Sequence, residues 1–376
     1  MKNIVLILLT LLLLSCTKNH SITSSCTITP SNTYMLFKIP NNLSQPFTYS
    51  MLRYDSITQE YLLYMKNMDR LIAVYLLKSQ ELKHIYNFAK DGPNAILNLS
   101  GFFYDENNIF HVMSGRIPMI YQVDSSGNVY DKFKYGLTSD NKRVLPSYSN
   151  TGFEVISNDG KLYLPLFDTD YIDGIKPYLI IDKTTNQIKY SDIDFIQTTS
   201  TGESLGNKSY WWCYNDQELI FAYEFDDRLA IHTPESSEYK FVTAKSQYID
   251  ELRQVIPENK DLYQKPERIR NNACYGPIIY DRYRKVYYRI AYLNSDCTPA
   301  EDWLGYSKCG RGNFSIMVLD KDFNLIGESL FPDCAKYSVN GIFVAPDGLY
   351  VNRSHCYDPE YSDDVLRYER FDLVYD

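Results

Sequence analysis

The amino-acid sequence predicts an all-β protein whose folded part is a single six-bladed β-propeller. Three observations lead to this prediction. Short apolar segments alternate with turns rich in Asp, Asn and Gly along most of the chain. Aromatic residues make up 15% of the sequence and Tyr alone accounts for 35 of 376 residues, which suits the half-buried surfaces of strands. A unit of such segments then recurs six times, as is typical of a radial array.

The first residues predict export and a lipid anchor. Lys2 precedes an apolar run over residues 4–14, which is too short to span a membrane but has the length of a signal-peptide core. The Leu-Leu-Ser-Cys sequence ending at Cys16 resembles the lipobox of bacterial lipoproteins, whose Cys is modified with acyl chains such as palmitate. We therefore predict a signal peptide over residues 1–15, lipidation of Cys16 and a flexible tether over residues 16–32. No acidic residue directly follows this Cys, which favours the periplasmic face of the outer membrane. The alternative is an ordinary secretory signal that ends at a Cys by chance.

The predicted blades follow in order along residues 33–376. Each contains four antiparallel strands joined by short turns. The complete units are predicted with strands over residues 50–54, 60–65, 71–77 and 82–88; 101–104, 109–113, 119–123 and 129–133; 153–156, 162–167, 178–182 and 187–190; 210–214, 219–225, 229–232 and 239–242; and 278–280, 286–292, 314–319 and 325–331.

The last unit predicts how the ring closes. It has three strands of its own, over residues 341–344, 349–352 and 365–373, while residues 34–39 form a strand without a neighbour. An N-terminal strand that completes the last blade removes both open edges. Seven blades, a β-sandwich with additional strands, and two smaller β domains remain open as alternatives.

One segment departs from the strand pattern, between the fourth and fifth units. Within residues 245–264 the apolar side chains have helical spacing, and a Pro follows them. We expect a short amphipathic helix here, formed around Tyr248, Ile249, Leu252, Val255 and Ile256 and ended by Pro257.

Together with the lipobox, several turn sequences carry a family resemblance. They are residues 91–94 (Asp-Gly-Pro-Asn), 101–103 (Gly-Phe-Phe), 123–128 and 345–348. With them the sequence resembles the uncharacterised β-propeller lipoproteins of Bacteroides-type bacteria, which are akin to TolB-like and other six-bladed propellers. The resemblance covers essentially the whole mature chain and implies the fold and the envelope location. It implies no catalytic residue.

Two motifs are weighed as sites of chemistry. Residues 202–206 match the G-x-S-x-G pattern of hydrolases, but no strand-turn-helix context surrounds them, so an inter-blade loop is the favoured interpretation. Asp168, Asp170 and Asp173 gather three carboxylates, as a calcium loop would. Their spacing differs from that of an EF-hand, and a solvated hairpin loop is favoured. We predict no cofactor. If this loop binds an ion, calcium is the one expected.

The cysteines predict disulfides in an oxidising compartment. Seven remain after Cys16, so at least one is left free or paired between molecules. Cys297 and Cys309 flank a single insertion and form the first candidate pair. Cys334 and Cys356 flank the first two strands of the last blade and form the second.

Binding residues are expected on the long loops, which share one face of a propeller. These loops cover residues 136–150, 168–176, 197–209, 245–273, 294–313 and 354–364. Arg and aromatic side chains are the usual anchors of recognition. The candidates on these loops are Arg143, Tyr171, Arg268, Arg270, Trp303, Arg311 and His355. The alternative is that the loops are merely tolerated insertions.

The function predicted from these features is a non-enzymatic binding module of the cell envelope. Its ligand would be a glycan, a peptide or a partner protein. The net charge of −9, without any basic block, excludes nucleic acid as a partner. Two alternatives stay open: a metal-assisted hydrolase or lactonase, and a structural role in an outer-membrane assembly. Carboxylates, Asn and His converging on the propeller axis would favour the enzyme, whereas the strand starts offer mainly aromatic and aliphatic residues.

Overall fold

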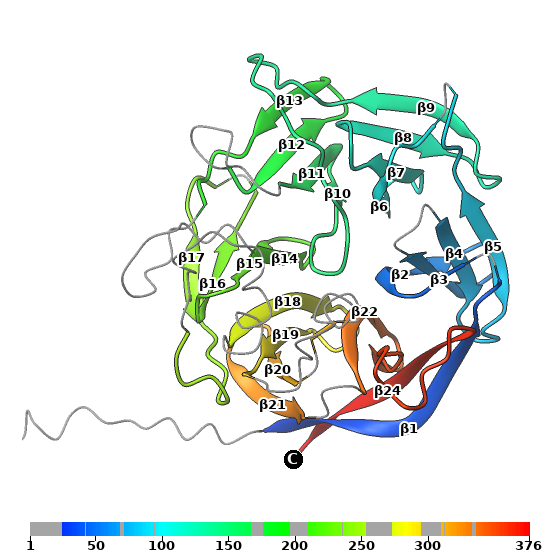
Figure 1. Cartoon of the computed structure of the whole chain (residues 1–376). Helices are drawn as coiled ribbons and strands as arrows, with labels where there is room; N and C mark the ends of the chain where they lie inside the picture. Colours follow the sequence, from blue (N-terminus) through cyan, green and yellow to red (C-terminus); the bar gives the residue numbers. More distant parts are fainter. Residues whose placement is uncertain are drawn as a thin grey trace, which may run out of the picture.

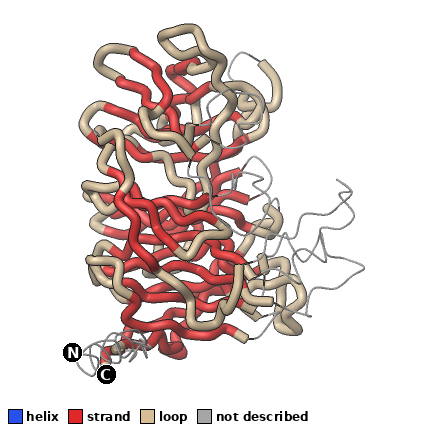
Figure 2. Tube along the Cα trace, turned by 90° about the vertical axis from the view of Figure 1, so that its left-hand side faces the viewer, coloured by secondary structure: helices blue, strands red, loops and turns tan. Residues whose placement is uncertain are grey.

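The computed structural model describes residues 25–41, 43–67, 71–92, 95–166, 176–195, 210–234, 236–252, 273–294, 310–311, 313–332 and 336–376. Within these ranges the chain forms six four-stranded antiparallel sheets and no helix. The sheets stand around a common axis as the blades of a propeller, with one edge strand of each near the centre (Figure 1). Seen from the side, strands fill the body of the disc and loops lie along its two faces (Figure 2). The six-bladed all-β prediction is confirmed.

Each of the first five blades runs outward from its inner strand in chain order. The first three blades are β2 (Phe47–Asp55), β3 (Glu60–Asn67), β4 (Leu71–Leu76) and β5 (Leu82–Asn87); β6 (Leu99–Tyr104), β7 (Phe110–Ser114), β8 (Met119–Val123) and β9 (Val129–Lys134); and β10 (Ile156–Asn158), β11 (Lys161–Pro165), β12 (Tyr178–Asp182) and β13 (Gln187–Tyr190). The next two are β14 (Tyr210–Tyr214), β15 (Leu219–Tyr223), β16 (Arg228–His232) and β17 (Lys240–Thr243); and β18 (Cys274–Asp281), β19 (Val286–Tyr292), β20 (Phe314–Leu319) and β21 (Leu325–Phe331).

The sixth blade contains both ends of the chain. It consists of β22 (Ser338–Ala345), β23 (Gly348–Asn352), β24 (Val365–Tyr375) and, outermost, β1 (Cys26–Lys38). β1 pairs with β24 from Cys26 opposite Tyr375 to Lys38 opposite Val365. β1 begins within the segment predicted as tether, because Cys26 and Ile28 are buried between the fifth and sixth blades and β24 supplies a complete hydrogen-bonding edge.

The hydrophobic core consists of six clusters, each shared by two neighbouring blades. Aromatic rings dominate several of them. Between the first and second blades the Tyr64 ring lies 6.1 Å from that of Phe102, and between the third and fourth the Tyr178 ring lies 5.7 Å from that of Trp212. The numerous tyrosines therefore hold the blades together, since large rings fill the wedge between twisted sheets and bury much apolar area.

Aspartates at the strand ends fix the tight turns. Asp55, Asp105 and Asp281 each follow or end an inner strand and accept a hydrogen bond from the backbone N–H two residues further on, at 3.1, 2.9 and 2.9 Å. A short polar side chain that satisfies its own turn favours this conformation over a longer strand. The Asp- and Asn-rich segments between apolar runs were predicted as turns for this reason.

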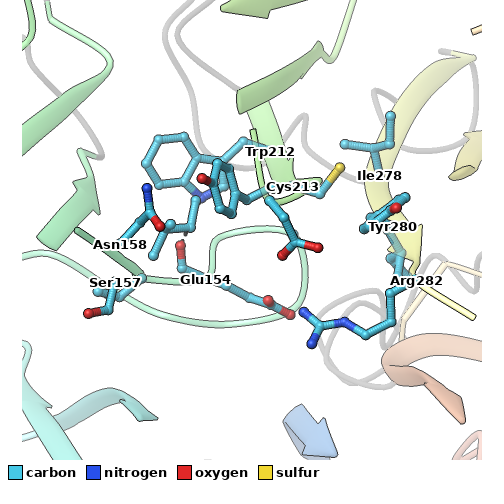
Figure 3. Close-up of a pocket in the computed structure, with 14 residues that line it drawn as sticks. Glu154, Ser157, Asn158, Trp212, Cys213, Ile278, Tyr280 and Arg282 are labelled. Carbon is cyan, nitrogen blue, oxygen red and sulfur yellow. Dashed lines mark hydrogen bonds between the residues drawn. The ribbon is translucent and has the colours of Figure 1, made fainter. Parts of the chain in front are cut away.

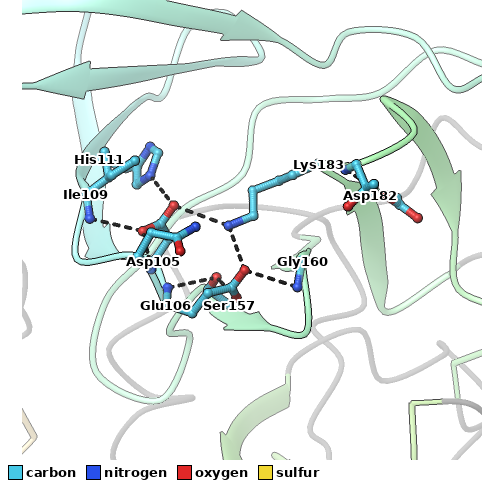
Figure 4. A network of polar contacts seen from close by, with 10 residues as sticks. Asp105, Glu106, Ile109, His111, Ser157, Gly160, Asp182 and Lys183 are labelled. Atoms are coloured by element: carbon cyan, nitrogen blue, oxygen red, sulfur yellow. Dashed lines mark hydrogen bonds and ion pairs between the residues drawn. The ribbon is translucent and has the colours of Figure 1, made fainter.

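A polar network joins the second and third blades (Figure 4). Asp105 Oδ2 lies 3.2 Å from both His111 Nε2 and Lys183 Nζ, and Lys183 also binds Glu106 Oε1 at 3.0 Å. Burial lowers the pKa of His111, although Asp105 opposes this effect. Burial alone would raise the pKa of Asp105, but hydrogen bonds from the backbone, His111 and Lys183 outweigh it and lower the net pKa. Charged Asp105 is therefore the stable form in the folded protein.

The predicted helix between the fourth and fifth blades is wrong in its described part. Residues 245–252 form turns and irregular backbone instead. The apolar spacing arises because Ile249, which is 2% exposed, anchors the loop in the core between these blades, whereas Tyr248 is exposed. Glu328 fixes the loop by accepting hydrogen bonds from Ser246 Oγ and the backbone N–H of Gln247. Residues 253–264 lie outside the described part of the chain.

Candidate binding site in the central channel

The structure places three of the seven predicted binding residues. Arg143 is exposed in the loop before β10, and its carbonyl accepts a hydrogen bond from Tyr190 Oη. Arg311 and His355 lie near each other, because His355 Nε2 is 3.0 Å from the carbonyl of Gly310. His355 is buried rather than presented on the surface. The four others lie outside the described residues: Tyr171, Arg268, Arg270 and Trp303.

The remaining site predictions fall mainly on undescribed segments. Asp168, Asp170 and Asp173 belong to them, and so do Cys297, Cys309 and Cys334. Both disulfide pairings and the calcium loop therefore stay predictions. Within the described ranges, no three His, Cys, Asp or Glu side chains gather as metal ligands would. A search of the same ranges also found no helix that is long and apolar enough to cross a membrane.

A cavity of about 570 Å³ lies at the centre of the ring. Its lining comes from β2, β6, β18 and β22 and from the segment before β10. A second cavity of about 290 Å³ adjoins it on the side of β14. The two share the lining residues Glu154, Val155, Ile279, Tyr280 and Arg282. Together they draw on all six blades, so we describe them as one central channel.

The channel depends on a segment that leaves the third blade. The sequence predicted a strand over residues 153–156, but β10 begins only at Ile156. Before it, Phe153 forms a parallel bridge with Trp212 of the fourth blade. The backbone N–H of Trp212 donates to the carbonyl of Gly152 at 2.7 Å, and its Nε1 donates to the carbonyl of Glu154 at 2.9 Å. This segment bends toward the centre of the ring in Figure 1.

Glycine at position 152 allows this close approach. Its φ of +80° lies in the left-handed region, and a Cβ atom there would sit 2.8 Å from Cδ1 of Trp211. Any larger residue would therefore push the segment away from β14. The consequence for the site is that Glu154, the residue two positions on, lines the channel.

Glu154 and Arg282 face each other inside the channel (Figure 3). Desolvation by the surrounding channel wall raises the pKa of the Glu154 carboxyl, and the positive charge of Arg282 opposes this effect, although both side chains remain exposed to the channel. Among the described residues, neither side chain has a hydrogen-bond or ion-pair partner. Burial and, in second place, the Glu154 charge also raise the pKa of Cys213, which faces the same channel. The channel therefore presents two opposite charges that are exposed to its water and make no direct contact with another described side chain.

Tyrosines and arginines surround the end of the channel where first and second strands are joined. We call this region the channel mouth and define it by Arg53, Tyr54, Tyr61, Tyr104, Tyr280, Arg282 and Tyr283. The Tyr54 and Tyr61 rings are 5.2 Å apart, and the Arg53 guanidinium lies 3.8 Å from the centre of the Tyr104 ring. Tyr54 is 50% exposed and Tyr283 is 40% exposed. Such amphipathic, rigid side chains are frequent anchors of binding sites.

Sequence reasoning places binding at the loops and at the mouth of a central pore, but it missed the residues of this site. It concentrated on the long loops of one face, whereas the channel mouth lies at the end of the ring that carries the tight turns. The available signals were a single charge between apolar neighbours, at Glu154, and an Arg directly after a buried strand end, at Arg282. Both signals are common at strand ends, and only the closed ring brings the two residues together.

Comparison with solved structures supports the fold. A member of the DUF4221 family from Bacteroides vulgatus superposes with a TM-score of 0.78 at 17% identity, covering 94% of this chain and 99% of that one. A "Putative exported protein" from Bacteroides fragilis gives a TM-score of 0.55 at 12% identity, covering 95% and 98%. A gluconolactonase from Xanthomonas campestris superposes with a TM-score of only 0.47 at 10% identity, covering 92% of this chain and 98% of that one. This similarity is too distant to support a statement about activity.

Comparison with protein families identifies the chain more specifically. A search of curated proteins found no match. One family model matches residues 31–330, which is most of the chain and most of the propeller. The resemblance to propellers of Bacteroides-type bacteria is confirmed at this level, while the TolB-like lipoprotein relationship stays a prediction. The chain therefore belongs to the family described as Domain of unknown function (DUF4221).

Proposed function

We propose that the protein is a binding module of the cell envelope that holds its ligand in the channel mouth. The observation that carries this proposal is the cavity of about 570 Å³, whose wall combines aromatic rings with unpaired charges. Ligand sites of proteins typically enclose about 300–1,000 Å³ and pair an apolar lining with few polar groups. Such a volume suits a small molecule, or the end of a peptide or glycan, better than a protein surface.

The proposed location is the periplasmic face of the outer membrane, with Cys16 as the lipid anchor. The lipobox ending at Cys16 supports this proposal, and a structurally similar protein from Bacteroides fragilis is described as exported. β1 starts at Cys26, so a tether of about ten residues would separate the anchor from the first blade. A short polar tether of this kind holds a domain close to the membrane but leaves it free to turn. The loop candidates, led by Arg143 and Trp303, remain a second proposed surface for larger partners.

The binding proposal is tested by removing two exposed tyrosines of the channel mouth. Small molecules found by thermal shift with the mature protein would be titrated calorimetrically against Tyr54→Ala and Tyr283→Ala. We expect about tenfold weaker binding for each variant, because each ring supplies contact area to the ligand. Tyr130→Ala is the matched control, since Tyr130 is 58% exposed but lies on the outer strand β9. Ligands that bind all four proteins equally would place the site elsewhere.

A further inference from the structure

The unpaired groups of the channel indicate the chemistry of its ligand. Glu154 and Arg282 project toward each other from the third and fifth blades, yet no hydrogen bond joins them within the described part of the chain (Figure 3). Both side chains are exposed to the water of the channel, so a ligand can reach each of them. A ligand that places a cation beside Glu154 and an anion beside Arg282 would satisfy both groups at once.

A third group in the same cavity also lacks a partner. Thr151 Oγ1 is buried, lines the larger cavity and makes no hydrogen bond to any described residue. It comes from the segment that carries Glu154, three positions away. This hydroxyl lies beneath the wall on the side of the channel that carries Glu154, so its oxygen adds a polar atom near that end of the ligand.

The rest of the wall mixes apolar residues with the tyrosines described above. Leu52, Phe103, Ile279, Ile342 and Phe343 line the larger cavity and come from four different blades. Such residues offer a large side chain apolar contacts that remove part of its surface from water. An amino acid with a large apolar side chain requires two opposite charges close together and apolar residues beside them.

We propose that the channel binds a free α-amino acid with a large apolar side chain, with Glu154 accepting hydrogen bonds from its ammonium group and Arg282 donating to its carboxylate. This proposal rests on the proposed function and names the ligand class for the same site. A guanidinium presents a planar fork of donors that matches a carboxylate in geometry. The ammonium and carboxylate of an α-amino acid sit on one carbon, so a single small ligand bridges the two side chains.

L-phenylalanine is the probe, titrated calorimetrically against the mature protein. We expect a Kd below about 1 mM. N-acetyl-L-phenylalanine lacks the ammonium and L-phenylalaninamide lacks the carboxylate, and we expect each to bind at least about tenfold more weakly. Each modification leaves one channel charge unpaired, whereas the ring is unchanged.

Two variants assign each end of the ligand to its residue. Glu154→Gln should weaken the binding of L-phenylalanine and abolish the difference in affinity between L-phenylalanine and the N-acetyl compound. Arg282→Gln should weaken the binding of L-phenylalanine and abolish the difference in affinity between L-phenylalanine and the amide. Glu81→Gln and Arg116→Gln are the matched controls, since both residues are exposed outside the channel lining, and they should bind as the wild type does. Unchanged melting temperatures would show that the variants are folded.

Three results would overturn the proposal: no binding of L-phenylalanine to the wild type, equal affinity for the blocked compounds, or unchanged affinity in both glutamine variants. Its failure is distinguishable from failure of the proposed function. If other small molecules bind and lose affinity in Tyr54→Ala and Tyr283→Ala, the proposed site stands and only the proposed ligand class is wrong. Ligands that are insensitive to every channel variant would reject the site itself.

Discussion

Replacement of Arg289 by Met should lower the free energy of unfolding by about 3–5 kcal/mol. Arg289 lies on β19 and is fully buried at the interface of the fourth and fifth blades. Its Nη1 donates to the carbonyls of Ala244 at 2.7 Å and Asp227 at 3.2 Å, and its Nη2 donates to that of Asp226 at 2.6 Å. The guanidinium also lies 3.5 Å from the centre of the Tyr275 ring.

The physical reason is that Met fills the space but removes the guanidinium donors from the carbonyls of Ala244 and Asp226, whereas the carbonyl of Asp227 keeps the backbone N–H of Ala244 at 2.8 Å. Burial lowers the pKa of Arg289, and the charges of Asp226, Asp227 and Glu328 oppose this effect. Removing the cation therefore also removes a nearby positive charge from these carboxylates, although Asp226 keeps its ion pair with Arg228 at 2.8 Å. Arg289→Lys should recover only part of the loss, because an ammonium cannot reproduce the planar fork.

Urea denaturation followed by circular dichroism measures this effect. Arg116→Met is the control, because Arg116 is exposed in a turn, and its change should stay within about 0.5 kcal/mol. If the free energy of unfolding of Arg289→Met lies within about 1 kcal/mol of that of the wild type, the carbonyls find other donors. The interface between the fourth and fifth blades would then not depend on this side chain.

The change Cys16→Ala should release the protein from membranes completely. Several acyl chains on one residue hold a protein far more firmly than a single chain, whose binding is marginal and reversible. Without the thiol, no acyl chain can be attached at the lipobox. The precursor should then stay uncut or the protein should become soluble in the periplasm, and detergent phase partition with cell fractionation would measure it.

Cys26→Ala is the matched control for the anchor. Cys26 is the other cysteine near the N-terminus, but its side chain is buried in β1 and burial, followed by the charge of Asp376, raises its pKa to about 11. This variant should partition into detergent as the wild type does. Equal detergent partition of Cys16→Ala and the wild type would contradict the proposed anchor.

The strand pattern could be predicted from the sequence because each blade is built from local information. Alternating apolar residues and Asx turns define β6 to β9 almost residue by residue, and the same holds for β19, β20 and β21, whereas only residues 278–280 of β18 were predicted. The helix prediction near Ile249 failed because apolar spacing alone does not distinguish a helix from a loop that anchors single side chains in a core. The irregular backbone before β10 was not predicted, because the strand that it pairs with, β14, belongs to another blade.

The candidate site could not be predicted, because it arises from long-range closure. Glu154 and Arg282 are separated by 282 − 154 = 128 positions and belong to non-adjacent blades. Their proximity follows only once six blades surround one axis and Gly152 lets the segment before β10 approach Trp211. The predicted loop residues are Arg, aromatic and His, and the channel mouth contains Arg and aromatic residues on shorter turns.

Crystallographic fragment screening of the mature protein tests the central claim most directly, because it requires no knowledge of the natural ligand. Several hundred chemically diverse fragments would be soaked into crystals, and the position of each bound fragment would be recorded. We predict that bound fragments concentrate in the channel mouth, against Tyr54, Tyr61 and Tyr283 and beside Arg282. A channel that holds only water while fragments collect at another surface would contradict the account.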